Sequence, residues 1–266
     1  MIESLNNEKI KYYTKLNDKK YRKSEKLFIA AGEHLVTEAL KKNIVKEILL
    51  LNGEENVYGD VTYVTSDILK KVSDLTNYPK VLAICYIKDD LKIEGNVVAL
   101  DNIKDPGNLG TIIRSAVAFN YDTILLSEEC VDVYNSKVVR ATEGMLFNVN
   151  IVTCDLFSTL LKLKESGYKI YGTDVVNGES PAYESNKHVL IIGSEARGMS
   201  NSIREICDKN LYIKMNDKCE SLNAGVSASI LMYELGETRW KIWIFWKKVF
   251  LLIRAFTIIR MFMKVL

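Results

Sequence analysis

Polar side chains follow three apolar runs of this 266-residue chain, and the first pair is Asn108 and Arg114. They lie in the stretch DNIKDPGNLGTIIRSA, which comes directly after the apolar residues 97–100. A strand, a glycine-rich turn and a helix start are typical of a phosphate cradle. The stretch contains neither G-x-G-x-x-G nor Gly-Lys-Ser/Thr, so a Rossmann dehydrogenase or a P-loop kinase is disfavoured. The residues alone also fit a plainer interpretation, in which Asn108 caps the helix and Arg114 is a surface cation.

The second and third loops carry further polar groups. VLIIGSEARGMS places Gly193 and Glu195 at the end of an apolar run. Gly193 would let a ligand approach the backbone, and Glu195 could bind a polar ligand or add charge to a helix start. IKMNDKCESLNAGVSASILMYEL places Ser221 and Asn223 before a helix whose first turns hold small residues. Either of the two could be the N-cap, and the small residues fit both a tightly packed core helix and a closely approaching ligand.

These loops belong to a segment in which strand and helix patterns alternate. We expect strands at VVALD, DTILLS, VNIVT, YKIYGTDV, HVLIIGS and NLYIKM, and helices at 109–120, 155–166, 201–207 and 223–235. The alternation predicts an α/β fold with a parallel sheet covered by helices. Ligands bind such sheets at the carboxyl ends of the strands, which is where the three loops fall.

A smaller α/β unit precedes this segment. It begins with a basic, amphipathic stretch at 9–26, in which Tyr12, Tyr13 and Tyr21 are interleaved with lysines. We expect strands at LFIAAG, VKEILLL, VTYVT and KVLAICYI and a helix at EHLVTEALKK. The polar stretch KDDLKIEGN predicts a linker, which gives domains at 1–90 and 96–237 and a tail at 240–266.

Composition limits the class of protein. The five cysteines form no C-x-x-C pair and the chain has two histidines, so we expect no metal site and a reducing compartment. The start has no apolar signal sequence, which predicts a cytoplasmic protein. The net charge of +2 includes seven basic and no acidic residues in 239–266, so the remainder is acidic. A nucleic-acid footprint would therefore have to be local.

In their order and spacing the three loops resemble the three motifs of the SpoU/TrmH family of RNA 2′-O-ribose methyltransferases, which belong to the SPOUT class. The stretch VYNSKVVRATEGMLF resembles the segment between the first two motifs, and residues 1–90 resemble an L30e-like RNA substrate-binding domain. In such a domain the basic stretch at 9–26 would recruit RNA, and we expect its three tyrosines to stack on bases. The resemblance implies a parallel sheet with a C-terminal trefoil knot, S-adenosyl-L-methionine as cofactor, and a homodimer with its active sites near the subunit interface. It implies ribosomal or transfer RNA as substrate, with guanosine as the expected target.

By motif position the resemblance assigns two sets of residues. The catalytic set is Asn108, Arg114, Glu195, Ser221 and Asn223, and the cofactor-binding set is Gly193, Ile213 and Leu222. A guanidinium stays protonated to above about pH 12, so Arg114 is a poor free base. We expect Arg114 to hold the adjacent phosphate, orient the ribose and stabilise the developing alkoxide. Asn108 would hold Arg114 or the ribose; the role of Glu195 is left open.

Some features depart from the family pattern. Ala196 stands where glycine is common, and Lys214 stands where proline is common, which could alter cofactor affinity. The tail at 240–266 has uncharged runs too short for a membrane span. On a helix, Lys247, Arg254, Thr257, Arg260 and Lys264 would share one broad face. Contact with an anionic membrane surface or a partner, and an extension without selected function, both fit. The alternative function is a non-catalytic RNA-binding relative that retains the knotted fold.

Overall fold

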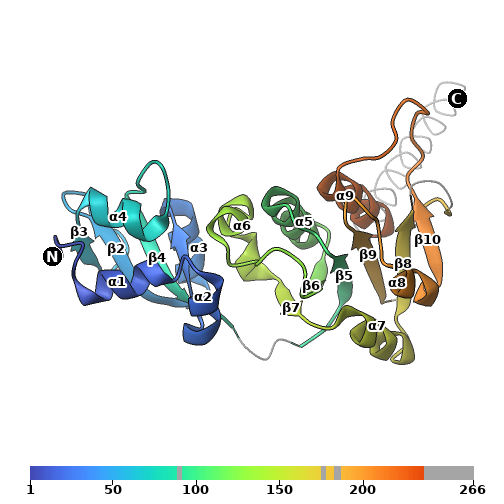
Figure 1. Cartoon of the computed structure of the whole chain (residues 1–266), viewed down its shortest axis with the longest axis horizontal. Coiled ribbons are helices and arrows are strands. Elements are labelled where there is room, and N and C mark those ends of the chain that lie inside the picture. Colours follow the sequence, from blue (N-terminus) through green and yellow to red (C-terminus); the bar gives the residue numbers. More distant parts are fainter. Residues whose placement is uncertain (89–91, 175–177, 183–186, 237–266) are drawn as a thin grey trace, which may run out of the picture.

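The computed structural model describes residues 1–88, 92–174, 178–182 and 187–236. It contains a four-stranded sheet near the amino terminus and a six-stranded sheet after it, side by side along the long axis (Figure 1). The basic hydrophobic tail predicted at 240–266 lies outside the described residues. Within the described part of the chain, no helix is both long and apolar enough to cross a membrane.

The first unit runs from α1 to β4. Its elements are α1 (Glu8–Lys15), α2 (Lys19–Glu25), β1 (Leu27–Ala31), α3 (Glu33–Lys41), β2 (Val45–Leu51), β3 (Thr62–Val64), α4 (Ser66–Ser73) and β4 (Val81–Tyr86). The strand order is β1-β4-β2-β3, with β4 antiparallel to β1 and β2. The basic stretch forms two helices because Asp18 caps a second one, its carboxylate accepting from the Lys20 backbone N–H at 2.8 Å.

Burial changes the interpretation of the three tyrosines in that basic stretch. Tyr13 was expected as a stacking residue, but it is 3% exposed and donates to Glu47 at 2.5 Å. This expectation is wrong because Tyr13 lies on the apolar face of α1, against the core of the unit. Tyr12 and Tyr21 remain partly exposed.

The second unit runs from β5 to α9. Its elements are β5 (Asn96–Asp101), α5 (Pro106–Ala118), β6 (Tyr121–Leu126), α6 (Ser136–Ala141), the 3₁₀ helix η1 (Met145–Asn148), β7 (Asn150–Thr153), α7 (Leu156–Glu165), β8 (Lys169–Asp174), β9 (His188–Gly193), α8 (Asn201–Ile206), β10 (Lys209–Tyr212) and α9 (Ala224–Leu235). The strand order is β10-β8-β9-β5-β6-β7 and all pairs are parallel, which confirms the predicted sheet.

Helices cover both faces of this sheet. Val98 and Leu100 of β5 pack with α5, α6 and α9, whereas Val97 and Ala99 pack with α7 and α8. Burial on both faces explains why the strands read as continuous apolar runs. The strand order reverses where β9 lies beside β5, and such a point is where ligands bind open α/β sheets. The trefoil knot stays a prediction.

Contacts join the two units directly. Arg22 of α2 is 5% exposed and pairs with Asp132 of the second unit at 2.5 Å. Phe28 of β1 lies 4.8 Å from Tyr134, between ring centroids, and one buried apolar cluster extends across the junction. The junction is therefore a packed interface as well as a covalent linker.

Candidate active site

The first loop positions Asn108 through its neighbour Asp105. The Asp105 carboxylate accepts from the Asn108 backbone N–H at 2.8 Å and caps α5, with Pro106 at the first helical position. The expectation that Asn108 caps the helix is wrong, because α5 begins three residues before the predicted start. Asn108 lies in the first turn, 9% exposed, and its side-chain amide donates to the carboxylate of Glu195.

The second loop is a tight turn at the end of β9. Ser194 and Gly198 exchange backbone hydrogen bonds of 3.1 and 2.8 Å. A Cβ on Gly193 would lie 2.2 Å from the carbonyl carbon of Gly198 and the nitrogen of Met199. The close approach predicted at Gly193 is thus made by the chain's own backbone. The turn holds Glu195 at its tip.

The third loop leads into α9, and Asn223 is its N-cap. The Asn223 side chain accepts from the backbone N–H groups of Gly225 and Val226 at 3.0 and 3.2 Å. A Cβ on Gly225 would lie 3.1 Å from side-chain atoms of Thr111 on α5. This small residue therefore serves close packing between α5 and α9, one of the two explanations that the sequence allowed.

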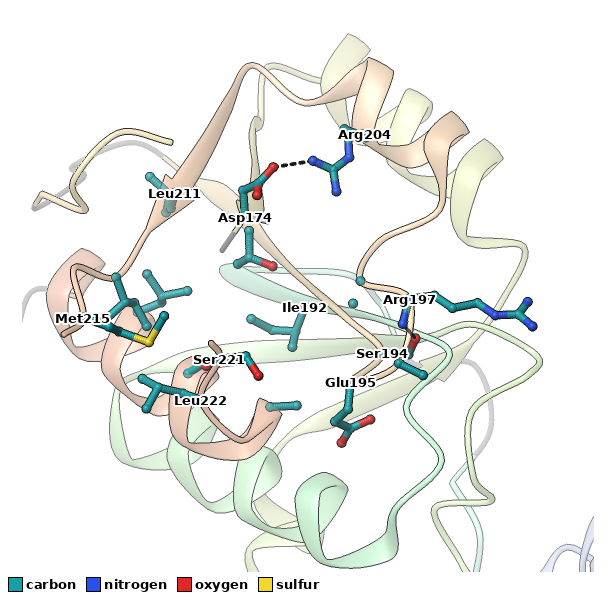
Figure 2. A pocket seen from close by; sticks show the side chains of 18 residues that line it. Asp174, Ile192, Ser194, Glu195, Arg197, Arg204, Leu211, Met215, Ser221 and Leu222 are labelled. Carbon is teal, nitrogen blue, oxygen red and sulfur yellow. Dashed lines mark hydrogen bonds and ion pairs between the residues drawn. The ribbon is translucent and has the colours of Figure 1, made fainter. Parts of the chain in front are cut away.

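The second and third loops, together with the end of β8, line one pocket of about 370 Å³ (Figure 2). Five residues that the sequence proposed line it: Gly193, Glu195, Ile213, Ser221 and Leu222. Asn108 reaches the pocket through its hydrogen bond to Glu195. Ile192 and Leu231 add apolar surface. Such a volume, apolar with a few convergent polar groups, suits a small organic ligand.

Sequence reasoning missed an ion pair in this pocket. Asp174 ends β8, and its carboxylate accepts from the guanidinium of Arg204 on α8. Figure 2 shows this pair on the opposite side of the pocket from Glu195. The Asp174 side chain is 14% exposed and that of Arg204 is 40% exposed. An acidic residue at the carboxyl end of a predicted strand was the pattern that could have identified it.

Arg114 is separated from the pocket. It is exposed on α5 and lines a different hollow, of about 430 Å³, with Thr111, Ser115 and Met145 among its neighbours. Six residues along a helix turn the side chain by about 120° net, so Asn108 and Arg114 face different ways. Within one chain the structure does not bring the predicted catalytic pair together.

Two protein-family models match the chain. The one described as the SpoU rRNA Methylase family matches residues 95–233, and the one described as an MRM3-like substrate binding domain matches residues 7–83. The chain belongs to the SpoU rRNA methylase family. It is 37% identical to the 23S rRNA (guanosine(2553)-2′-O)-methyltransferase RlmP of Bacillus subtilis over 246 residues, 88% of this chain and 98% of that protein.

Solved structures of methyltransferases have the same fold. The AdoMet-bound rRNA methyltransferase of Sinorhizobium meliloti superimposes with a TM-score of 0.78 at 25% identity, covering 88% of this chain and 95% of that one. AviRb of Streptomyces viridochromogenes, in complex with AdoMet, gives a TM-score of 0.75 at 25% identity, covering 86% and 97%.

S-adenosylmethionine is the cofactor of this SpoU enzyme, and the pocket fits it. The cavity has apolar surface for an adenine ring, at Ile192, Ile213 and Leu222. The charged pair Asp174–Arg204 offers an acceptor and donors for hydroxyl, amino and carboxylate groups. The lining of the pocket therefore matches a ligand with one flat apolar end and several polar groups.

Proposed function

We propose that this SpoU enzyme methylates the ribose 2′-hydroxyl of a guanosine in 23S ribosomal RNA. The observation that carries the proposal is a pocket lined by the second and third motif loops, to which Asn108 of the first loop is joined by its hydrogen bond to Glu195. The RNA and the base are taken from the name of the B. subtilis relative, which matches this chain over nearly its whole length. When bound, S-adenosylmethionine supplies an electrophilic methyl group, so the protein's task is positioning and proton handling.

Cofactor binding falls to the second and third loops in this proposal. Gly193, Ile213 and Leu222 contact the cofactor mainly through backbone groups, and Ser221 shapes the pocket at its substrate end. Their placement around one cavity supports these roles. Asn223 acts as the cap that fixes the start of α9, since its side-chain oxygen is engaged by two backbone N–H groups.

Proton handling falls to the first loop. A 2′-hydroxyl is a weak nucleophile, and Arg114 activates it by holding the adjacent phosphate and stabilising the oxygen as its proton passes to solvent water. Glu195 fixes Asn108 through its hydrogen bond, and the Asn108 side-chain oxygen remains available to accept from the ribose.

Arg114 reaches a pocket only if a second copy provides one. We infer a homodimer in which α5 and α9 of one subunit face the other, so that Arg114 completes the partner's site. Two observations support this: Arg114 is exposed and lines a hollow other than the cofactor pocket, and Val226 on α9 is 45% exposed. A two-fold axis would use the same surface twice.

RNA recruitment falls to the amino-terminal unit. Lys11, Lys19, Lys20 and Lys23 on α1 and α2 are exposed and suit contact with phosphates. Lys15 lies 5.5 Å from the centroid of the Tyr21 ring. In this proposal the exposed lysines, more than the tyrosines, recruit the RNA.

Mapping 2′-O-methyl sites in ribosomal and transfer RNA, with and without the gene, tests the proposal. We expect one guanosine of 23S RNA to lose its methyl group when the gene is deleted and to regain it on complementation. An unchanged methylation map would instead support a non-catalytic RNA-binding role.

A further inference from the structure

The first loop begins with a buried carboxylate that no step of the proposed function uses. Asp101 is the last residue of β5 and is 9% exposed. Its carboxylate accepts a hydrogen bond of 2.8 Å from the backbone N–H of Ser200, which lies 99 residues further along the chain. Because Ser200 is the N-cap of α8, this bond joins the end of a central strand to the start of a helix.

The bond anchors the turn that carries Glu195. In the parallel sheet Asp101 lies beside Gly193, the residue at which β9 ends. The chain passes back over this strand end, since a Cβ on Gly193 would lie 2.2 Å from the backbone nitrogen of Met199. Residues 194–198 form the turn between these two points, and all five line the cofactor pocket. Asp101 therefore holds the far end of the pocket-lining turn close to the strand where the turn begins.

The same bond fixes the opposite wall of the pocket. The backbone N–H of Arg204 donates to the Ser200 carbonyl at 3.0 Å, so the position of Ser200 sets that of the first turn of α8. Arg204 lines the pocket and pairs with Asp174 on the side away from Glu195 (Figure 2). A shift of Ser200 would therefore displace the Arg204 guanidinium together with the turn that carries Glu195.

The sequence of α8 supplies no local partner for this N–H. In a capping box, a Glu or Gln at the third helical position accepts from the N-cap N–H, but that position is Ile203 here. Among the residues that the structure describes, the Ser200 hydroxyl caps none of the helix N–H groups. Asp101 thus provides from β5 the acceptor that α8 lacks, and a buried carboxylate makes a strong, charge-assisted hydrogen bond.

We propose that Asp101 is a positioning residue for the cofactor pocket. Through the Ser200 N–H it holds the turn that carries Glu195, and the guanidinium of Arg204, in the arrangement that binds S-adenosylmethionine. Asp101 acts through the backbone, since it is not among the described residues that line the pocket. The inference rests on the cofactor pocket and not on which RNA is methylated, so it can fail while the proposed function stands.

Calorimetric titration of the full-length protein with S-adenosylmethionine, without RNA, tests the proposal. We expect Asp101→Ala to weaken cofactor binding about tenfold, whereas Asp101→Asn retains an acceptor oxygen and should stay within about twofold of wild type. Ser200→Pro removes the donor instead, and the φ of −62° at Ser200 already suits proline. Ser200→Ala keeps the N–H and is the matched control, with wild-type affinity expected.

Removal of either partner of one bond should have the same effect. We expect Ser200→Pro to match Asp101→Ala, and the double variant to be little worse than either. If Asp101→Ala does not fold, Ser200→Pro carries the measurement, because its substitution is at an exposed residue. Wild-type affinity in Ser200→Pro, or an equal loss of affinity in Asp101→Asn or Ser200→Ala, overturns the proposal.

Amide hydrogen exchange of the cofactor-free protein gives a second measurement. We expect faster exchange in residues 194–206 of Asp101→Ala and Ser200→Pro, with β6 as protected as in wild type and with Asp101→Asn like wild type throughout. A contribution to stability alone would speed exchange in β6 to the same extent. Exchange that rises equally in both segments, or in neither, therefore overturns the positioning role.

Discussion

The side-chain amide of Asn108 donates a hydrogen bond to the carboxylate of Glu195, which lies 87 residues further along the chain. Each partner is fixed by its own neighbours: Asp105 holds the first turn of α5, and Ser194 and Gly198 close the turn that carries Glu195. The first and second loops therefore act as one preorganised unit at the edge of the pocket.

If Asn108 and Glu195 act through their mutual hydrogen bond, their substitutions will not be additive. We expect Asn108→Ala and Glu195→Ala each to lower kcat about 100-fold, and the double variant to be little worse than either. Glu195→Gln retains an acceptor oxygen and should keep most of the activity. Steady-state kinetics on RNA measures all four variants. Effects that multiply in the double variant would show that the two residues act separately.

The Asp174–Arg204 pair should affect the cofactor more than the chemistry. Arg204→Ala removes the guanidinium that donates to the Asp174 carboxylate at the pocket wall, and we expect cofactor binding to weaken about tenfold. Lys164→Ala breaks the nearby ion pair with Asp208, which does not line the pocket, and serves as the control. Calorimetric titration with S-adenosylmethionine compares the variants. Equal affinities in wild type and Arg204→Ala would contradict this role.

The pattern of apolar runs predicted the larger sheet well because strands buried on both faces leave little room for other interpretations. The short helix α4 and the segment from α6 to η1 were missed, since elements of four to eight residues carry too little periodicity. The expectation that ligands bind at the carboxyl ends of parallel strands also located the pocket. It was not applied to Asp174, which ends β8.

Other features depend on contacts that no local pattern contains. The need for glycine at 193 comes from the backbone at 198–199, and burial of Tyr13 comes from packing of α1 on the sheet. Choosing Asp105 over Asn108 as the cap depends on where α5 begins, which is the least certain part of any helix prediction. In the proposed dimer, whether Arg114 meets a pocket depends on the second subunit, which a single sequence does not place.

Glu47 should make the stability of the first unit depend on pH. Burial alone would raise the pKa of Glu47, but hydrogen bonds from Lys9, Tyr13 and Thr62 outweigh it and lower that pKa below its ordinary value of 4.5. A lowered folded-state pKa contributes stability above the unfolded-state value, and this contribution is lost as pH falls through the folded-state value.

We therefore expect Glu47→Gln to lower the free energy of unfolding by about 1–2 kcal/mol at pH 7. The difference from wild type should shrink below pH 4.5 as the wild-type carboxylate is protonated. Glu25→Gln, at an exposed carboxylate, is the control and should have a smaller effect. Urea titrations at several pH values measure this, and a difference that stays constant with pH would contradict it.

Mixing two inactive variants tests whether Arg114 acts on the partner's pocket. Arg114→Ala and Glu195→Ala homodimers should each be nearly inactive, whereas a mixed dimer pairs the intact pocket of one chain with the intact Arg114 of the other. After subunit exchange we expect recovery of about a quarter of wild-type activity, because about half the dimers are mixed and each has one complete site. No recovery despite verified exchange would place both groups in the same chain.

Methyl transfer by Arg114→Ala tests the central claim most directly. Purified protein is incubated with S-adenosylmethionine carrying a tritiated methyl group and with unmodified 23S RNA, and 2′-O-methyl product and cofactor affinity are measured together. The account predicts wild-type cofactor affinity with transfer reduced at least about 100-fold, and only partial activity in Arg114→Lys, because an ammonium lacks the two-pronged hold on phosphate. Full transfer by Arg114→Ala would contradict it.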